Sequence, residues 1–438
     1  MTEDVSQALI MHLPQHVGKA VCVRGWLRNK RSGKNIHFLI LRDGTGEVQC
    51  VASGDSLPAE TMQLCDALGI ESSLEVVGIV REDARSPGGY EVALSEVKPL
   101  QVVNDFPISK KEHGVEFLME HRHLWLRSRR QVAILRIRDE LEKAWADFFY
   151  ERGFARVDAP IFTPAACEGT TTLFDVDYHG DTAYLTQSGQ LYNEATIFAL
   201  GRVYCFGPTF RAEKSKTRRH LLEFWMLEME AAFFEQEDNL RLQEELLVFS
   251  IARVLQKCGR ELATLQRDTD KLVNIAAPFP RLHYRDAVEQ INRQMPDRAE
   301  PFRYGDDFGA PEETFISQQF EQPVFVTNFP VGTKAFYMKP DPDEPDTVLA
   351  ADLLAPEGYG EIVGGSQRED DLDALEKRVG EHGLPREAFQ WYFDLRRYGS
   401  VPHSGFGLGL ERTLAWLCGL SHIREAIPFP RMLHHLYP

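Results

Sequence analysis

Hydrophobic and polar residues alternate through roughly the first quarter of the chain, in runs that are separated by turn-forming residues. The runs occupy residues 20–27, 36–53, 73–83 and 86–103, and each shows the partial period-two alternation of half-buried strands. The sequences DGTG and SPGG occur in these runs and are typical of hairpin turns. The pattern predicts a small all-β barrel in this part of the chain.

The pattern changes after a polar, proline-containing segment at residues 104–114. Apolar residues then recur every three or four positions from Arg130 to Gly153, which predicts a long helix that ends at the glycine. Beyond it, strand-like runs alternate with helical ones. We therefore expect an α+β chain with a barrel domain at residues 1–104, a linker at 105–120 and a larger domain at 121–438.

Composition excludes several classes of protein. Hydrophobic residues make up 43% of the 438 positions and charged residues 26%, as in globular proteins and unlike disordered chains. No run of about 18 uncharged apolar residues occurs, and the first residues are acidic where a secretory signal would be basic. The seven cysteines include no CxxC pair. We expect no membrane segment, a cytoplasmic location with reduced thiols, and no structural metal.

Charge limits how the chain could bind nucleic acid. The net charge of −17 argues against indiscriminate binding, because contacts with phosphate need local positive charge. Basic patches occur at residues 24–42, 122–138 and 211–220. The second patch could contact a nucleic acid, but a solvated helix face, or pairing with acidic neighbours across a dimer, is the favoured interpretation.

Three segments place polar residues in otherwise strand-like sequence, at 153–164, 210–224 and 405–416. Each has an ordinary structural explanation when taken alone, and the glycine-rich third segment does not match GxGxxG or GxxxxGK[ST]. Their order is more informative. Together they resemble motifs 1, 2 and 3 of the class II aminoacyl-tRNA synthetases, and with a β-barrel in front they resemble the aspartyl, asparaginyl and lysyl subgroup.

This resemblance covers essentially the whole chain and implies both a fold and an activity. The fold would be an N-terminal OB-fold barrel that binds the anticodon, followed by a class II catalytic domain built on an antiparallel sheet flanked by helices. The activity would be the ATP-dependent ligation of an amino acid to tRNA through an aminoacyl-adenylate. Motif 1 builds a dimer interface in the family, so the resemblance also implies a homodimer.

In that reaction an amino-acid carboxylate attacks the α-phosphorus of ATP, so the site must hold anions together and neutralise their charge. By resemblance to motif 2, the planar fork of Arg211 would bridge the α-phosphate and the substrate carboxylate. Glu213 would bind the adenine amino group, His220 the γ-phosphate, and Phe224 would stack on adenine. Arg412 in motif 3 would cover the other adenine face. Arg211 and Arg412 are thus the expected catalytic residues.

Two carboxylates, Asp352 and Glu361, resemble the family's ligands for Mg²⁺, a hard cation that prefers oxygen. The sequence between them, DLLAPEGYGE, is two residues longer than in the aspartyl enzymes. This difference in length weakens the match to the family's metal ligands at Asp352 more than at Glu361.

Two segments resemble the family's amino-acid-binding loops. CEGTTTLF, at residues 167–174, is similar to a mobile loop in which Glu168 would contact the α-ammonium group. QSGQLYNEA, at residues 187–195, is similar to the QSPQxxKQ of aspartyl enzymes and would place Ser188 and Gln190 near the amino group.

Asparagine and aspartate are nearly isosteric, so a site must discriminate between them by charge and hydrogen-bond polarity. The aspartyl pattern has a lysine where this chain has Asn193. Arg368 resembles the family arginine that binds the side-chain oxygen, and it suits either substrate. An amide also needs an acceptor for its NH₂ group, for which Glu223 is the first candidate and Glu194 the second. His403 would lie beside the pocket.

The runs GGSQRED and YGSVPHSGFGLGLER are similar to those of asparaginyl enzymes, where aspartyl relatives read GAQR and PPHGG. The resemblance therefore implies L-asparagine and tRNA(Asn) as substrates, besides ATP with Mg²⁺. In the barrel, Phe38 and Gln49 match positions that bind the central anticodon uridine, and Arg31 lies nearby. Without Gln49 and the flanking cations, Phe38 alone would be interpreted as a core residue.

Three alternatives remain at this stage. A non-discriminating aspartyl-tRNA synthetase would also activate aspartate. A synthetase-like asparagine synthetase would make asparagine from aspartate and ammonia, although such paralogues generally lack the barrel. A non-enzymatic module that binds nucleic acid through the barrel would not need the arginines of motifs 2 and 3.

Overall fold

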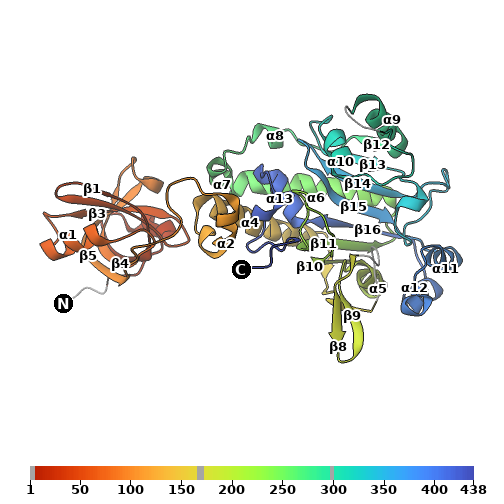
Figure 1. Ribbon diagram of the computed structural model, residues 1–438, viewed down its shortest axis with the longest axis horizontal. Coiled ribbons are helices and arrows are strands. Elements are labelled where there is room, and N and C mark those ends of the chain that lie inside the picture. Colours follow the sequence, from red (N-terminus) through yellow and green to blue (C-terminus); the bar gives the residue numbers. More distant parts are fainter. Residues whose placement is uncertain (1–4, 165–171, 296–299) are drawn as a thin grey trace. The chain divides into compact units, whose positions relative to one another are not determined.

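The computed structural model describes residues 5–164, 172–295 and 300–438 and divides into two compact units, Met1–Val115 and Glu116–Pro438 (Figure 1). The division falls inside the segment expected to be a linker. The last residues of that segment form the short helix α2 (Val115–Glu120).

The first unit is a closed barrel with the strand order β1-β2-β3-β5-β4, as the alternating pattern predicted. Its strands are β1 (Ala20–Ser32), β2 (Ile36–Arg42), β3 (Glu47–Ser53), β4 (Ser73–Glu82) and β5 (Tyr90–Gln101). The DGTG turn joins β2 to β3, where Asp43 Oδ1 accepts hydrogen bonds from the backbone of Thr45 and Gly46 at 2.8 and 3.1 Å. This local bonding lets the short polar side chain close the turn.

One element of the barrel was not predicted, the helix α1 (Ala59–Ala67) between β3 and β4. Lys30 closes its C-terminal end by donating hydrogen bonds to the carbonyls of Cys65 and Leu68 at 3.2 and 2.9 Å. Cations are favoured at this end of a helix, because its last carbonyls lack partners within the helix.

The second unit is built on an eight-stranded sheet with the order β12-β13-β14-β15-β16-β11-β10-β6. All neighbours from β13 to β10 are antiparallel, as expected, whereas the pairs at the two edges, β12–β13 and β6–β10, are parallel. The strands are β6 (Ala155–Arg156), β10 (Arg202–Phe210), β11 (Glu223–Ala232), β12 (Arg281–His283), β13 (Val324–Thr327), β14 (Ala350–Ala355), β15 (Gly360–Gln367) and β16 (His403–Gly409). A separate small sheet contains β7 (Phe162–Thr163), β9 (Asp181–Leu185) and β8 (Asp175–Tyr178).

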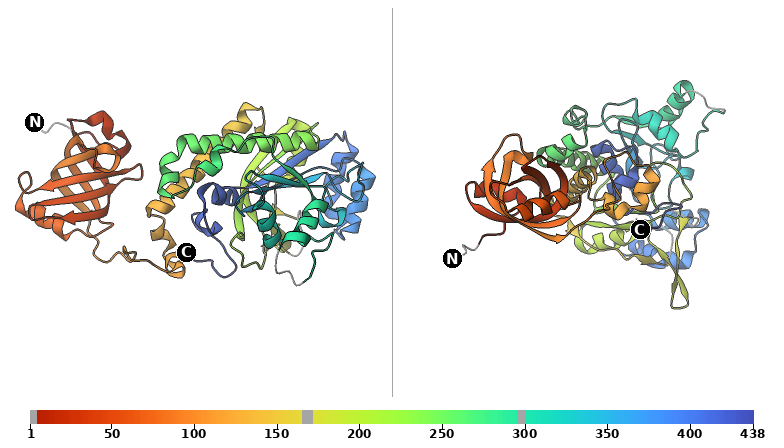
Figure 2. Two further views of the ribbon diagram at one scale, coloured as in Figure 1. Left: turned by 90° about the horizontal axis from the view of Figure 1, so that it is seen from above. Right: turned by 60° about the vertical axis from the view of Figure 1, so that its left-hand side comes forward.

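Helices flank the large sheet. Besides α2 they are α3 (Arg122–Trp125), α4 (Arg129–Glu151), α5 (Gln190–Leu200), α6 (Gln236–Lys257), α7 (Gly259–Thr264), α8 (Asp270–Val273), α9 (Tyr284–Gln294), α10 (Ala310–Ser317), α11 (Leu372–Glu381), α12 (Gln390–Arg397) and α13 (Leu410–Cys418). The long α6, green in Figure 2, runs along the sheet. The predicted long helix is α4, which is capped by Ser128 and stops just before Gly153, where φ is +72°.

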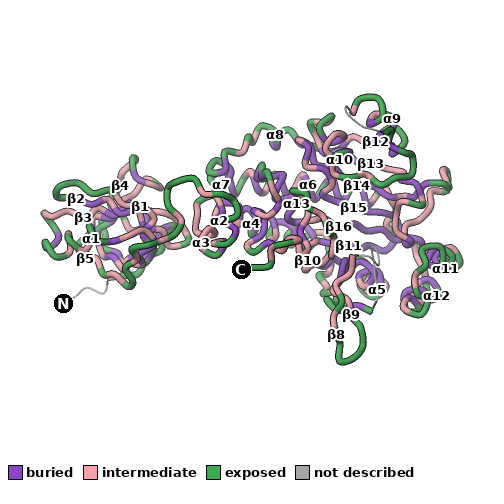
Figure 3. The backbone as a smooth tube through the Cα atoms, in the orientation of Figure 1, coloured by how far each residue is buried: buried purple, intermediate pink, exposed green. Residues whose placement is uncertain are grey.

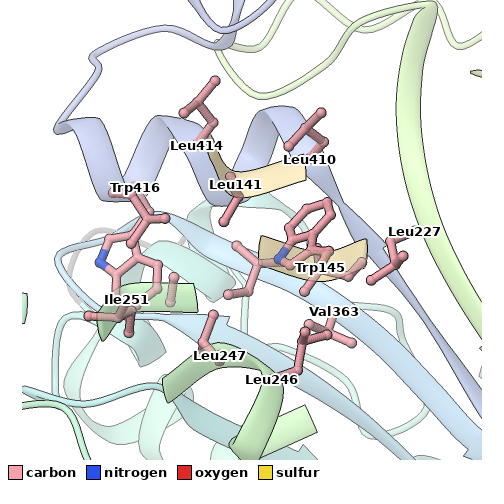
Figure 4. Close-up of a cluster of buried hydrophobic side chains, with 14 of the residues drawn as sticks. Leu141, Trp145, Leu227, Leu246, Leu247, Ile251, Val363, Leu410, Leu414 and Trp416 are labelled. Carbon is pink, nitrogen blue, oxygen red and sulfur yellow. The ribbon is translucent and has the colours of Figure 1, made fainter. Parts of the chain in front are cut away.

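The main core lies where α4, α6 and α13 cover one face of this sheet. Figure 4 shows its centre, formed by Leu141, Trp145, Leu246, Leu247, Ile251, Leu410, Leu414 and Trp416 from the helices with Leu227 and Val363 from the sheet. In Figure 3 the central strands are largely buried, whereas the β8–β9 hairpin is mostly exposed. Among the described residues, no helix is long and apolar enough to cross a bilayer.

The basic stretch at residues 122–138 has partners within this unit. Arg122 donates to the carbonyls of Ile427 and Pro428, both at 2.8 Å. Other arginines of the stretch form ion pairs, Arg130 with Glu425 at 2.7 Å and Arg138 with Glu411 at 2.6 Å. These arginines therefore fasten α3 and α4 to the C-terminal segment and to α13.

Candidate active site

The two faces of strand β11 have different surroundings. One face packs into the hydrophobic core beneath the helices, and the other carries acidic side chains. Because side chains alternate along a strand, Leu227 and Met229 enter the core while Glu228 and Glu230 point to the other side. Across the ladder, these two glutamates pair with glycines of β16, Glu228 with Gly407 and Glu230 with Gly405. A Cβ at Gly405 would collide with the Glu230 carboxylate. The glycines therefore leave room for charged side chains over the sheet.

A polar cavity of about 310 Å³ lies on this face, the lower end of the range for small-ligand sites. Its polar lining side chains come from strands β11, β14 and β15, from helices α5 and α10, and from the segments between them. They include Ser188, Gln190, Arg211, Glu228, Asp307, Glu313, Lys334, Tyr337, Asp352, Glu361 and Arg368.

Arg368 follows β15 and enters this cavity with its charge already balanced. Its side chain is only 3% exposed and forms a two-point ion pair with Glu230, at 2.5 Å from Nη2 and 3.2 Å from Nε. Its third nitrogen donates to Ser366 Oγ at 2.7 Å. Burial, together with the nearby Glu194, raises the pKa of Glu230 against the opposing effect of Arg368.

Ser188 and Gln190 line the same cavity at the start of α5. Glu228 fixes this turn, because its carboxylate accepts hydrogen bonds from Ser188 Oγ and, at 2.7 Å, from the backbone N–H of Gly189. Gln190 in turn donates to Glu194 at 3.0 Å.

Three predicted amino-acid contacts do not line the cavity. Glu194 is fully buried behind it and accepts from Arg396 and Tyr392, both at 2.7 Å, while His403 lies 3.0 Å away. Burial alone would raise the pKa of Glu194, but Arg396 and His403 hold it below its ordinary value. Glu223 begins β11 at the far end of the strand from Glu230. Glu168, another predicted contact, falls in residues 165–171, outside the described part of the chain.

A second, narrower cavity of about 70 Å³ contains the predicted nucleotide residues Arg211, Glu213, His220, Phe224 and Arg412, together with Glu361. Arg211 and Glu361 also line the larger cavity, so the two spaces meet at these residues. Glu213 lies 3.4 Å from His220 across the narrow space. Entry of a nucleotide therefore requires lining side chains to move.

Arg211 lies directly after β10, with its guanidinium 5.6 Å from the centre of the Phe224 ring. Its Nε is buried, and the described residues offer that atom no hydrogen-bond partner. A buried donor without a partner is costly unless a ligand satisfies it. Arg211 is therefore available for an anion at the junction of the cavities.

The two predicted metal ligands, Asp352 and Glu361, both have a carboxylate oxygen near Gly364 of β15. Glu361 accepts from Arg412 at 2.9 Å, and Asp352 pairs with Lys334 at 2.5 Å. An added Cβ at Gly364 would lie 3.0 Å from Glu361 Oε1 and 3.7 Å from Asp352 Oδ1. Burial raises the pKa of Asp352 to about 7, with Lys334 opposing and Glu361 adding to this rise. Burial would also raise the pKa of Glu361, but the nearby Arg412, Lys334 and Arg211 outweigh that effect and lower the pKa.

On the barrel, Arg31, Phe38 and Gln49 lie on neighbouring strands. Arg31 pairs with Phe38 across β1 and β2, with its guanidinium 5.5 Å from the ring centre. Phe38 is half-buried and lies outside the barrel core. Gln49 pairs with Ile40, two residues from Phe38, and its amide donates to Ser86 at 3.0 Å and Glu91 at 3.2 Å.

Sequence reasoning missed Glu228, Glu230 and Lys334. The run EFWMLEMEAA was interpreted mainly as a core strand. Its two glutamates with a spacing of two, opposite a GFGLG strand, were the available signal for a charged face. Nothing in the sequence around Lys334 indicates that it reaches Asp352.

Comparisons with known proteins agree with this geometry. The family model described as "tRNA synthetases class II (D, K and N)" matches residues 114–433, and an "OB-fold nucleic acid binding domain" matches residues 21–100. The sheet, the paired cavities and these matches define a class II aminoacyl-tRNA synthetase.

Individual relatives show which member of this class the chain resembles. The asparagine–tRNA ligase of Pelotomaculum thermopropionicum is 61% identical over 99% of this chain and 100% of its own length, and that of Thermus thermophilus is 56% identical with the same coverage. The crystal structure of asparaginyl-tRNA synthetase from Pyrococcus horikoshii complexed with asparaginyl-adenylate matches over the full length of both chains with a TM-score of 0.95 and 43% identity. The chain belongs to the asparagine–tRNA ligase family.

Proposed function

We propose that this enzyme activates L-asparagine with ATP to form asparaginyl-adenylate and then transfers the asparaginyl group to tRNA(Asn). The observation that carries the amino-acid specificity is the buried ion pair of Arg368 and Glu230. While Glu230 is ionised it neutralises the guanidinium, so a second carboxylate gains little from Arg368, whereas a carboxamide oxygen can still accept a hydrogen bond.

In the proposed first step, an oxygen of the asparagine α-carboxylate bonds to the α-phosphorus of ATP, and pyrophosphate leaves with the electrons of the broken P–O bond. Arg211 lies where the two cavities meet, and its Nε lacks a partner among the described residues. We assign it to hold the α-phosphate and the carboxylate together. Phe224 and Arg412 would enclose the adenine, with Glu213 at its amino group and His220 at the γ-phosphate.

Asp352 and Glu361 fit the expected Mg²⁺. Both carboxylates point to the side of Gly364, where a Cβ would take up part of the space between them. Within the described residues, no cluster of three or more His, Cys, Asp or Glu side chains could hold a metal alone. A metal here would therefore complete its coordination with phosphate and water oxygens, and when bound it would neutralise phosphate charge.

The amino-acid end is assigned to groups that line the larger cavity. Ser188, Gln190 and Glu228 would receive the α-ammonium group, and Arg368 the side-chain oxygen. Glu223 and Glu194, the expected acceptors for the side-chain NH₂ group, do not line this cavity, and the acid beside Arg368 is Glu230. Glu194 becomes a positioning residue that acts through its hydrogen bond with Gln190.

The proposal extends to partners. The barrel face with Arg31, Phe38 and Gln49 would bind the anticodon of tRNA(Asn), and the enzyme would act as a cytoplasmic homodimer. The cysteines among the described residues are all free thiols, which supports a reducing compartment.

The test is ATP–pyrophosphate exchange with asparagine and aspartate side by side, in the absence of tRNA. We expect exchange with asparagine and little with aspartate. Exchange of similar efficiency with aspartate would instead identify a non-discriminating enzyme.

A further inference from the structure

Lys334 is a charged residue in the active-site cavity that the proposed reaction does not use. It follows the short 3-10 helix at Val331–Thr333, and its side chain is 13% exposed. Its ammonium lies 2.5 Å from Asp352 Oδ2 and 3.7 Å from the centre of the Phe329 ring. One carboxylate and one aromatic face therefore hold it in place.

The carboxylate that holds Lys334 is one of the two assigned to the metal. Lys334 binds Oδ2 of Asp352, while Oδ1 lies on the side of Gly364, where Glu361 Oε1 also lies. A metal ion binds a carboxylate oxygen at about 2.0–2.6 Å. A divalent cation on Oδ1 would thus lie within a few ångströms of the ammonium, in a cavity where like charges are poorly screened.

We infer that Lys334 is a built-in counter-ion that competes with the divalent cation for Asp352, so that the metal binds tightly only when the nucleotide supplies further negative charge. The inference rests on the proposed metal site. Without nucleotide, Lys334 balances the acidic groups of the cavity, which include Asp307 and Glu361. With nucleotide, the phosphates add enough negative charge to hold both cations.

This role differs from that of an ordinary structural ion pair. A structural pair would leave metal affinity unchanged or lower it on mutation, because loss of Lys334 would disorder Asp352. A competing counter-ion predicts the opposite sign, since its removal frees Asp352 and lowers the positive charge that the metal meets.

The experiment measures binding of Mn²⁺ alone to the full-length enzyme by electron paramagnetic resonance, with and without ATP. We expect K334M to bind Mn²⁺ at least about tenfold more tightly than the wild type without ATP, and to differ less when ATP is present. K334R keeps the charge and should stay within about threefold of the wild type. K339M is the matched control, because Lys339 pairs with Asp370 outside both cavities and its loss should leave Mn²⁺ affinity unchanged.

Unchanged or weaker Mn²⁺ binding by K334M would overturn the inference, as would an equal gain in K334R. The double variant K334M/D352N should lose the gain, and a retained gain would mean that the ion binds elsewhere. If D352N does not weaken Mn²⁺ binding with ATP, the proposed metal site itself is wrong. If D352N weakens it but K334M does not tighten it, only the counter-ion role of Lys334 fails.

Discussion

The barrel face and the catalytic cavity use charge in different ways. On the barrel, Phe38 is half-buried, and Arg31 lies over its ring rather than in a buried ion pair. At the cavity, Arg368 is almost completely buried and forms an ion pair with Glu230, which is equally buried. The first arrangement combines a partly exposed aromatic ring with a cation that lies over it. The second holds two opposite charges that are almost completely shielded from solvent.

The difference follows from what each region is proposed to recognise. Any base offers a face for stacking, so a partly exposed aromatic residue suffices to bind one. Asparagine and aspartate have almost the same shape, so only buried charges with a defined balance can separate them. The two regions should therefore respond separately to mutation, with the larger effects in the cavity.

The largest effect is expected for Arg211→Ala. Removal of the guanidinium at the junction of the cavities should lower adenylate formation by at least about 10³-fold, or about 4 kcal/mol of transition-state stabilisation. ATP–pyrophosphate exchange measures it. Exchange within tenfold of the wild type would show that Arg211 does not touch the reacting groups.

Glu230→Gln should change specificity more than overall rate. Without the carboxylate, Arg368 carries an unbalanced positive charge that favours aspartate, so the preference for asparagine should fall by about 10–100-fold, or about 1.4–2.7 kcal/mol. The ratio of kcat/KM for the two amino acids in exchange measures the change. A variant that loses activity with both substrates equally would mean that Glu230 only maintains the fold.

Phe38→Ala should affect the tRNA step alone. Loss of one stacked base costs about 2 kcal/mol, so kcat/KM for charging tRNA(Asn) should fall by about thirtyfold while exchange without tRNA stays unchanged. Ile79→Ala is the control, because Ile79 is an apolar residue on β4 of the barrel that is exposed and has no proposed role in tRNA binding. A parallel loss in both reactions would assign Phe38 a structural role.

The smallest effect is a pH dependence of specificity. Burial raises the pKa of Glu230, so this carboxyl takes up its proton at a higher pH than an exposed glutamate. As pH falls from 8.5 to 5.5, protonation should leave Arg368 unbalanced and lower the preference for asparagine several-fold, while the aspartate side chain stays ionised. In Glu230→Gln the preference should not vary with pH. A preference that varies equally in both enzymes would exclude Glu230 as the group responsible.

The fold was largely predictable from sequence because local pattern and tertiary structure agree. The alternating runs form the strands of the barrel, and the segment after Arg130, where apolar residues recur every three or four positions, forms α4. Helix α1 was missed because its residues lack a clear apolar stripe, and tertiary packing rather than propensity stabilises such a short helix. The parallel edge strands were missed because pairing partners far apart in the chain leave no local signal.

The candidate site was predictable where residues belong to contiguous motifs. Arg211, Glu213, His220 and Phe224 were expected together and do line one cavity. The acceptor for the side-chain NH₂ group was expected at Glu223 or Glu194, neither of which lines the cavity, and the acid that pairs with Arg368 is Glu230. The ion pair joins residues 138 positions apart, and only the placement of β11 within the sheet decides which of its glutamates meets Arg368.

Gly405 of β16, which has no side chain and lies opposite Glu230, has a consequence for protein engineering. Any larger residue at Gly405 would strike the carboxylate across the ladder. A change in the amino acid that this enzyme charges would therefore require substitutions on β11 and β16 together. Changing the acidic residue alone would leave an empty groove, and changing the glycine alone would push its neighbour out of place.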